Sequence, residues 1–405
     1  MNNKVNKIIK VVIILCLLVL IGDLIFFGYI KNKRDKNKTF FASLNSIVRY
    51  KDNYFGVGSN NINNKSLEKA TLIKYNSNYK EIWKSSLDTK YNSTYFNIKK
   101  DGDYLLAVGS YEKTKEENEE SLRTALFVKY DNKGKVIFKK TLQILGNSKF
   151  TNVLVVSDGY IVVGQSIYPN DILGNEKTGG AIIVKYSKDG KVLWQKNVGG
   201  NKSGLFNDVI KSGNYLYAVG KDATRYGMVA KYSLDGEQIK VVSYAKTDTL
   251  GFSSIVKSGN YFICVGAKKV NENDEYDHDI NGLIVKYDAD LEKVDEKVYT
   301  ENKNGLERFN KVIVDSNKNI IAIGHEAIID KKKSTKKKNV YYYKSFIVKY
   351  NSDLKKLKEK VYHNGIDDYF TIVMEINHTY VIGGYEKYNS NHYKPIFVGY
   401  GKELK

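Results

Sequence analysis

An acidic run in the second half of the chain has the residue types and spacing of a calcium-binding loop. Asp277, Asp279 and Asn281 alternate with other residues and precede Gly282, as at the start of a loop that ligates Ca²⁺ through oxygen atoms. The twelfth position is Asp288, but the intervening residues have the pattern of an extended strand, which would carry it away from the loop. The three residues are therefore candidate ligands of a partial calcium site, with an ordinary acidic surface loop as the alternative. No other cofactor is expected.

A run of lysines farther along the chain has the charge needed to contact a polyanion. The chain has 65 Lys and Arg against 45 Asp and Glu, a net charge of +20, which suits lipid headgroups or cell-wall polymers. A solvated loop is the alternative, and nucleic acid is not an expected partner because arginine is scarce. The candidate polyanion contacts are Lys331, Lys332, Lys333, Lys336, Lys337 and Lys338.

Familiar catalytic patterns are missing from the sequence. The histidines show no metal-ligand spacing, and no Gly-x-Ser-x-Gly nucleophile elbow occurs. The two cysteines, Cys16 and Cys264, cannot build a disulfide framework. The sequence therefore predicts a protein that is not an enzyme, and a glycan-active enzyme of the cell envelope, hydrolase or lyase, is the alternative.

Three short patterns recur in fixed order along the rest of the chain, seven times each. The first is an aromatic residue or Leu followed three positions later by Ile or Val, from Leu44–Ile47 to Tyr369–Ile372. The second is an apolar strand that ends in glycine, from Gly58 to Gly383. The third is an apolar strand that ends in Lys-Tyr, from Tyr75 onward, with Gly-Tyr at Tyr400.

Turn residues separate these patterns, so each repeat predicts a meander of four short strands. One such sheet cannot bury both faces alone, whereas seven packed around an axis can. We therefore expect an all-β, seven-bladed β-propeller of four-stranded antiparallel blades over residues 39–405. The last repeat lacks a fourth strand, and the segment Thr39–Ala42 is expected to supply it and close the ring.

The third position of the first pattern is polar in all seven repeats. If this strand lines the central channel, these side chains form a ring that suits a small polar ligand or an ion, with a solvated channel wall as the alternative. Long loops between the second and third strands, such as Ser110–Arg123, predict a binding face for a protein or a cell-envelope polymer. The candidate ring residues are Ser46, Asn97, Asn152, Asp208, Ser254, Lys311 and Thr371.

The stretch Lys185–Trp194, which reads KYSKDGKVLW, resembles bacterial propeller families whose strands follow a Gly-x-x-x-Trp-x-Lys type of pattern. These families include the quinoprotein-like and the outer-surface seven-bladed repeats. The resemblance implies the propeller fold for residues 43–405. Quinoprotein dehydrogenases use vicinal cysteines, which this chain lacks, so their activity is not implied.

The N-terminus predicts a membrane anchor. Residues 1–10 form a short basic tail, and Val11–Ile30 is an apolar run of 20 residues with a single charge, Asp23. At 1.5 Å per residue such a helix spans the hydrocarbon core of a bilayer. Residues 31–38 are a basic linker, and no cleavage site follows the run. We expect a single-pass protein with its propeller outside the cytoplasm, acting as a binding or scaffold protein.

Overall fold

The regular structure in the described part of the chain consists of β-strands. The computed structural model describes residues 41–61, 68–113, 122–142, 146–167, 180–198, 204–222, 226–244, 249–269, 280–301, 306–330, 334, 340–364, 366–389 and 392–404. Within these ranges the chain forms strands β1 to β27 and no helix. The predicted all-β class is confirmed.

Consecutive strands pair antiparallel into sheets that follow the repeats of the sequence. The first four sheets have four strands each. They are formed by β1 (Phe41–Tyr50), β2 (Asn53–Asn61), β3 (Glu68–Tyr75) and β4 (Glu81–Ser86); β5 (Ser93–Asp101), β6 (Tyr104–Lys113), β7 (Leu122–Asp131) and β8 (Val136–Leu142); β9 (Asn147–Val156), β10 (Gly159–Ile167), β11 (Gly180–Ser187) and β12 (Val192–Val198); and β13 (Leu205–Ser212), β14 (Tyr215–Lys221), β15 (Gly227–Ser233) and β16 (Gln238–Ser243).

The fifth sheet has eleven strands and contains three antiparallel meanders. Single parallel pairs, Ile280 with Leu306 and Tyr343 with Asp367, join one meander to the next. The meanders are β17 (Thr249–Ser258), β18 (Tyr261–Lys269), β19 (Ile280–Tyr287) and β20 (Lys293–Tyr299); β21 (Leu306–Val314), β22 (Ile320–Ile329), β23 (Tyr341–Tyr350) and β24 (Lys356–Tyr362); and β25 (Asp367–Ile376), β26 (Thr379–Asn389) and β27 (His392–Gly401).

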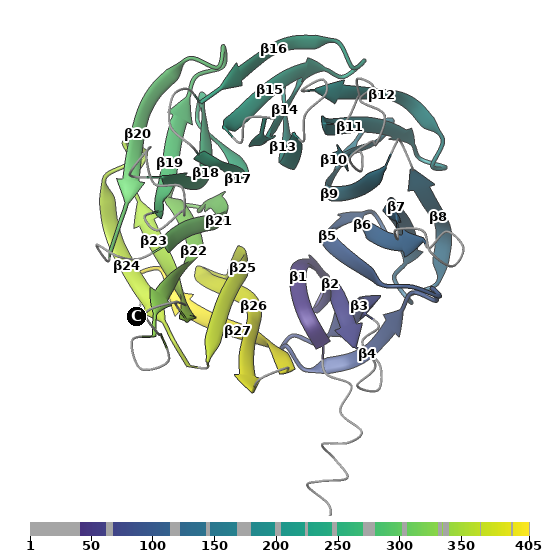
Figure 1. The fold of residues 1–405 in the computed structure, drawn as a ribbon, viewed down its shortest axis with the longest axis horizontal. Coiled ribbons are helices and arrows are strands. Elements are labelled where there is room, and N and C mark those ends of the chain that lie inside the picture. Colours follow the sequence, from purple (N-terminus) through teal and green to yellow (C-terminus); the bar gives the residue numbers. More distant parts are fainter. Residues whose placement is uncertain are drawn as a thin grey trace, which may run out of the picture. The chain divides into compact units, whose positions relative to one another are not determined.

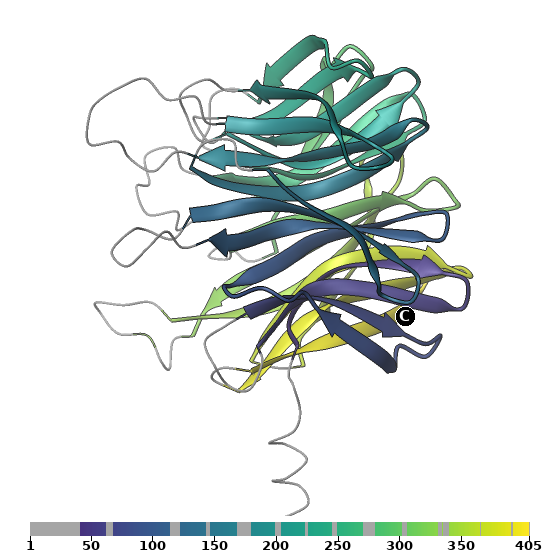
Figure 2. The same ribbon diagram turned by 90° about the vertical axis from the view of Figure 1, so that its right-hand side faces the viewer.

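The meanders are arranged around a common centre, with the first strand of each innermost and the last outermost (Figure 1). This is the architecture of a β-propeller, and each meander is one blade. Figure 2 shows the blades edge-on, with their strand ends at two opposite faces. The third strand of a blade is covered on both sides, so Ala125, Leu126, Phe127 and Val128 of β7 are all completely buried. Such a strand is a continuous apolar run, which is why these runs were visible in the sequence.

Each innermost strand carries a one-residue bulge next to the glycine of the second pattern. In the blade β9–β12, Phe150 pairs with Gly164 and Asn152 pairs with Val163, so Thr151 is the extra residue. A Cβ atom on Gly164 would lie 2.0 Å from the carbonyl oxygen of the residue before Phe150. The bulge therefore requires glycine at this position, because only glycine permits so close a backbone approach.

The extra residue of the bulge ties its blade to the next one. Its side chain donates a hydrogen bond of 2.5–2.9 Å to a backbone carbonyl in the innermost strand of the following blade. Five such bonds join Asn45 Nδ2 to Tyr95 O, Thr151 Oγ1 to Phe206 O, Asn207 Nδ2 to Phe252 O, Asn310 Nδ2 to Phe370 O and Thr371 Oγ1 to Leu44 O. The last of these bonds joins the final blade to the first.

The last blade is offset by one residue from the alignment expected from the sequence. Phe370, not Tyr369, pairs with a glycine of β26, and Thr371 is the bulge residue. Ile372 therefore takes the position that was assigned to Thr371 in the polar ring. Two adjacent aromatic residues and two adjacent glycines, Gly383 and Gly384, made the two alignments equivalent in the sequence.

The lysine of the Lys-Tyr pattern forms a second tie between blades. Its ammonium donates to a backbone carbonyl in the turn after the third strand of the following blade, at 2.9–3.4 Å. The aliphatic part of the lysine is buried between the two blades while its charge reaches this polar rim. The pairs are Lys129 with Lys188, Lys185 with Leu234, Lys231 with Ala289, Lys286 with Ser352 and Lys349 with Lys402.

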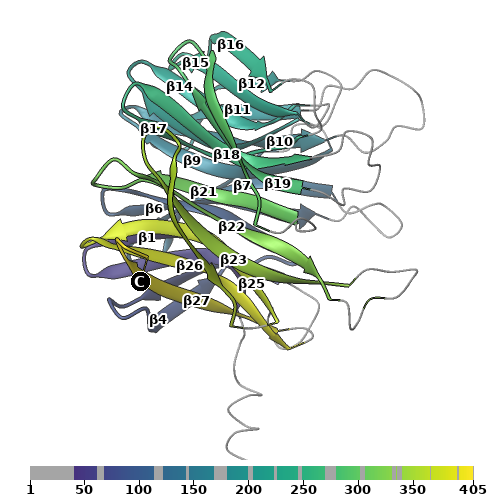
Figure 3. The same cartoon turned by 90° about the vertical axis from the view of Figure 1, so that its left-hand side faces the viewer.

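The first and last blades meet through side-chain packing. Phe397 of β27 stacks on Tyr79 with ring centroids 4.7 Å apart and contacts Tyr75 edge-on at 5.4 Å. Leu44 and Ile372 are buried in the same apolar cluster. Figure 3 shows β1 beside β25, β26 and β27 on this side of the ring.

The prediction that Thr39–Ala42 supplies the outer strand of the last blade is wrong for its described part. Strand β1 begins at Phe41, and Phe41 pairs with Asn60 of β2. Within the described residues the last blade has three strands, with β27 at its outer edge. Thr39 and Phe40 lie outside the described residues.

The predicted membrane span Val11–Ile30, with its flanks 1–10 and 31–38, also lies outside the described residues. Within the part of the chain that the structure describes, no helix has the length and apolar character needed to cross a bilayer.

Candidate functional site

Four of the seven predicted ring residues meet across the channel at the carboxylate of Asp208. Lys311 donates to Asp208 Oδ2 at 2.7 Å, and Ser254 donates to the same oxygen at 2.7 Å. Asn152 donates to Asp208 Oδ1 at 2.5 Å. These residues come from four different blades, and their side chains meet at the inner strands of the propeller.

The carboxylate of Asp208 is completely occupied by donors. The backbone N–H groups of Val209 and Ile255 add hydrogen bonds of 3.0 and 3.3 Å to the three side-chain bonds. Burial by itself would raise the pKa of Asp208, but the charge and hydrogen bond of Lys311, with Lys99 and Ser254, lower it overall. This part of the ring is thus an internally satisfied ion-pair network.

The other ring residues take no part in this network. Ser46 lies in the innermost strand β1. Thr371 donates a hydrogen bond to the carbonyl of Leu44, between the last blade and the first. The Oδ1 atom of Asn97 is buried and has no hydrogen-bond partner in the described part of the chain. Ligand binding by the ring remains a prediction.

One channel residue, Lys99, was missed by the sequence analysis. It lies two positions beyond Asn97 on β5, and the equivalent positions of other blades include Val48, Ile210 and Val256. Burial and the charge of Lys311 lower the pKa of Lys99, and Asp208 acts in the opposite direction. Only a comparison of all seven repeats at this position reveals a lysine among apolar residues.

Of the residues predicted for the calcium site and the polyanion contact, the structure describes only Asn281. Asn281 lies in β19, paired with Lys268, while Asp277, Asp279 and all six lysines of the predicted polyanion contact fall outside the described residues. Within the described ranges, no group of three His, Cys, Asp or Glu side chains is placed to hold a metal ion.

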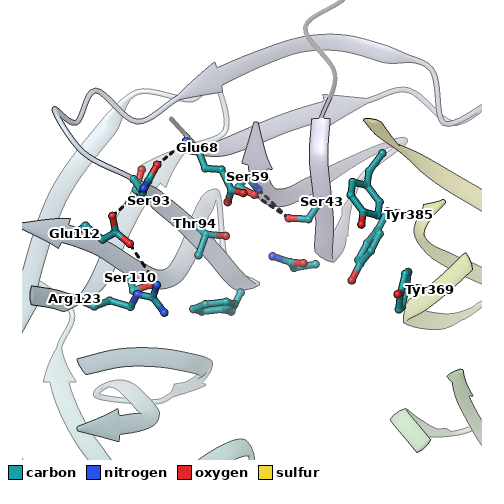
Figure 4. A pocket seen from close by; sticks show the side chains of 14 residues that line it. Ser43, Ser59, Glu68, Ser93, Thr94, Ser110, Glu112, Arg123, Tyr369 and Tyr385 are labelled. Carbon is teal, nitrogen blue, oxygen red and sulfur yellow. Dashed lines mark hydrogen bonds and ion pairs between the residues drawn. The ribbon is translucent and has the colours of Figure 1, made fainter. Parts of the chain in front are cut away.

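A cavity of about 680 Å³ opens where the last blade meets the first two, at the strand ends that lead into the long loops. Ser110 and Arg123, the ends of one predicted long loop, both contribute to its wall. Figure 4 shows tyrosines from the last blade on one side and Glu112 and Arg123 on the other. The lining residues are Ser43, Asn45, Ser59, Glu68, Asn92, Ser93, Thr94, Phe96, Ser110, Glu112, Arg123, Tyr369, Tyr385 and Tyr393.

The aromatic side of the pocket is a cluster of half-buried tyrosines. Tyr369 and Tyr385 are stacked, with ring centroids 4.9 Å apart, and Tyr393 meets Tyr385 edge-on at 5.6 Å. Behind them, Tyr343 lies 5.0 Å from Tyr369. Burial, with a contribution from Tyr393, raises the pKa of Tyr385 to about 12, so its hydroxyl remains a hydrogen-bond donor at neutral pH.

The opposite side of the pocket is organised by the side-chain amide of Asn92, which bonds to the backbone of Glu68 and to the carboxylate of Glu112. Asn92 accepts a hydrogen bond from the backbone N–H of Glu68 at 2.8 Å and donates to Glu112 Oε2 at 2.8 Å. The other oxygen of Glu112 faces Arg123 at 3.4 Å. Between the two sides, the hydroxyls of Ser43 and Ser59 share a hydrogen bond of 3.1 Å. This side therefore offers hydroxyl, amide, carboxylate and guanidinium groups to a ligand.

The sequence analysis predicted a binding face at the long loops, which this pocket adjoins, but it did not identify these residues. Tyr369 was taken as the buried aromatic of its repeat, a role that belongs to Phe370. Tyr385 and Tyr393 belong to no repeated pattern. The one available signal was the adjacent aromatic pair Tyr369-Phe370, of which one member has to point away from the core.

No family model matches the chain, and no curated protein matches it in sequence. Its architecture is similar to that of solved structures at about a tenth sequence identity. The Dos1 propeller, 10% identical, covers 89% of this chain and 93% of its own with a TM-score of 0.49. CoXyl43, a GH43 β-xylosidase/α-arabinofuranosidase from a compost microbial metagenome, is 11% identical, with coverages of 63% and 92% and a TM-score of 0.35. The GH43 endo-arabinanase from Bacillus licheniformis is 10% identical, with coverages of 64% and 98% and a TM-score of 0.32.

These comparisons correct the prediction that the chain is not an enzyme. Glycoside hydrolases stand beside the Dos1 propeller among the similar structures, so the absence of enzymatic activity does not follow from this architecture. At this identity the likeness concerns the fold alone, and no activity is transferred from it.

Proposed function

We propose that this protein is a seven-bladed propeller that binds a saccharide chain in the pocket between its last and first two blades. The observation that carries the proposal is the tyrosine cluster facing a wall of hydroxyl, amide and carboxylate groups. A sugar ring has C–H groups that pack on an aromatic face and hydroxyls that need polar partners at the edge. Pockets that combine aromatic walls with a few placed polar groups are typical of ligand sites.

The seven repeats of the sequence support the blade count. Four separate sheets and three meanders of the fifth sheet each hold one copy of the three patterns. The apolar run Val11–Ile30 supports a single membrane anchor, and the propeller would then lie outside the cytoplasm, where envelope polymers are accessible. Protease treatment of intact cells tests this location: loss of the propeller supports it, and protection of the propeller in intact but not in lysed cells contradicts it.

Saccharide binding is tested by calorimetric titration with neutral and acidic envelope oligosaccharides. Tyr385→Ala should weaken binding at least tenfold, because the stacked ring forms the aromatic wall. Tyr261→Ala, a change at an exposed tyrosine of β18, is the matched control and should bind as the wild type does. The proposal fails if no saccharide binds, or if Tyr385→Ala binds as tightly as the control.

Glycan cleavage is a second candidate, because two carboxylates, Glu68 and Glu112, line the same pocket. Glycoside hydrolysis uses a pair of carboxyl groups on either side of the scissile bond. Glu68→Gln and Glu112→Gln should each slow the release of reducing ends by a factor of about 100 or more, since each would remove one member of the pair. A wild type that binds the oligosaccharide and leaves it intact over days rules out this candidate and leaves binding in place.

A further inference from the structure

Three positively charged side chains from three consecutive blades gather beyond one end of the pocket. Arg123 of β7 lines the pocket, Lys149 lies on β9, and Lys221 ends β14. The ammonium of Lys149 lies 5.7 Å from the ring centroid of Phe96, which is itself part of the pocket wall. Lys149 is therefore next to the part of the pocket wall that Phe96 of β5 forms.

Phe96 interrupts the tie between two blades at this end. It is the extra residue of the bulge in β5, where Tyr95 pairs with Gly109 and Asn97 pairs with Val108. At five other seams this position holds the Asn or Thr that donates to the next blade. A phenyl ring makes no such bond and instead faces the pocket, so the sequence departs from the structural pattern where the pocket ends.

Among the described residues, cations act on one another at this end of the pocket. Arg123 faces Glu112 at 3.4 Å, and its side chain is 50% exposed, which leaves donors of its guanidinium toward the pocket. Burial, then the charges of Arg123 and Lys221, lower the pKa of Lys149. The neighbours that act on this half-buried ammonium are thus cations, and an anion placed there would relieve their mutual repulsion.

We propose that the saccharide bound in the pocket is anionic, and that its carboxylate or phosphate group lies beside Phe96 between Arg123 and Lys149. The inference rests on the proposed saccharide site and specifies the chemistry of its ligand. A guanidinium supplies paired donors in a plane, and an ammonium adds a point charge, a combination that suits an anionic group with several oxygens. Sugar rings on the anion's other side extend toward Tyr385 and Tyr369.

The test compares oligosaccharides that differ only in charge: trigalacturonate with its methyl ester, and a neutral oligosaccharide with its phosphorylated form. Calorimetry on the full chain in detergent should show at least tenfold tighter binding of the charged member at 50 mM salt, and a smaller difference at 0.5 M salt. Tighter binding of trigalacturonate alone identifies a carboxylate ligand, and of the phosphorylated sugar alone a phosphate ligand.

Lys149→Met should remove most of the preference for the charged oligosaccharide and leave the affinity for the neutral one unchanged. Lys149→Arg keeps the positive charge and should therefore keep the preference. Lys211→Met, at an exposed position of β13, is the control for a change in net charge. The inference is overturned if the charged and neutral oligosaccharides bind equally well, or if Lys149→Met retains the preference for the charged one. Either result would contradict an anionic ligand group at Lys149 without contradicting saccharide binding in the pocket. Absence of binding by every oligosaccharide refutes the proposed function itself.

Discussion

The central channel and the pocket are both lined by polar side chains, but those side chains have different partners. In the channel, the Asp208 carboxylate accepts bonds from Asn152, Ser254 and Lys311, so this acceptor is already occupied by groups of the protein. In the pocket, hydroxyls, carboxylates and a guanidinium line an open cavity of about 680 Å³. Polarity in a sequence therefore does not by itself mark a binding site; the unused bonding capacity of the folded groups does.

The largest expected effect is a loss of folding stability after substitution of Asp208 in the channel. Asp208→Asn would leave the half-buried ammonium groups of Lys311 and Lys99 without their buried counter-charge. Breaking a buried ion pair costs about 3–5 kcal/mol, and the partial exposure of Lys311 puts the expected loss at the lower end, about 3 kcal/mol. Urea unfolding of the variant should show this loss, whereas Asp235→Asn in an exposed turn should leave stability unchanged. A loss below about 1 kcal/mol would show that the channel network is solvated rather than structural.

Folding stability is expected to depend on pH through His325, which packs against Tyr369 of the pocket wall. Burial, and then the charge of Arg308, lower the pKa of His325 to about 4. Asn310 donates to His325 Nδ1 at 2.9 Å, and this bond requires the neutral ring. Because the folded-state pKa lies below the usual value, the stabilisation is present above pH 6.5 and is lost as the pH falls toward 4, by about 3 kcal/mol.

His325→Gln is the control for this pH effect. Unfolding measured between pH 4 and 7 should show a flatter pH dependence in the variant than in the wild type. The same slope in both proteins would mean that the imidazole is solvated and that other groups cause the dependence.

Two asparagines provide a matched comparison of the regions. Asn152→Ala removes a buried hydrogen bond to a charged group and should cost about 2 kcal/mol of stability without changing saccharide affinity. Asn92→Ala should cost about 1 kcal/mol or less, because its partners are near solvent, but should weaken saccharide binding about tenfold as Glu68 and Glu112 lose their positions. The contrast between the two regions fails if both variants lose stability and binding together.

The smallest effect concerns the seam that the pocket crosses. Thr371→Val removes one hydrogen bond to Leu44 and should lower stability by about 1 kcal/mol. Thr151→Val removes the equivalent bond between two interior blades and should cost a similar amount. Differential scanning calorimetry with a bound oligosaccharide should show a gain in stability for both variants, because a ligand of the folded state stabilises every variant that binds it. A smaller gain for Thr371→Val than for Thr151→Val would show that the pocket depends on the seam between the last and first blades.

The fold was predictable because its physical cause repeats. Each blade needs a covered third strand and a glycine beside the bulge, so these features recur in the sequence at fixed places. The polar ring was visible by residue type, but its pairing was not, because Asp208 and Lys311 are 103 residues apart and meet only after the ring closes.

The pocket was less predictable than the fold, because its residues are exceptions to the repeat. Phe96 stands where five other repeats carry Asn or Thr with a structural role, and Tyr369 precedes the aromatic that the core requires. Such departures can be recognised only when the role of each repeat position is known. The bulge defines that role, and no single sequence reveals it.

Within the described residues the last blade has three strands, and no backbone ladder joins it to the first blade. The described contacts at this seam are stacked aromatic side chains, one apolar cluster and one hydrogen bond. We therefore expect the propeller to open here first when force is applied to the N-terminal segment. Tyr369 and Tyr385 lie on one side of that joint, and Ser43 and Glu68 lie on the other. A glycan bound across this joint would contact both sides and hold them together. At a free glycan concentration of one hundred times the dissociation constant, binding would stabilise the closed propeller by about 2.7 kcal/mol.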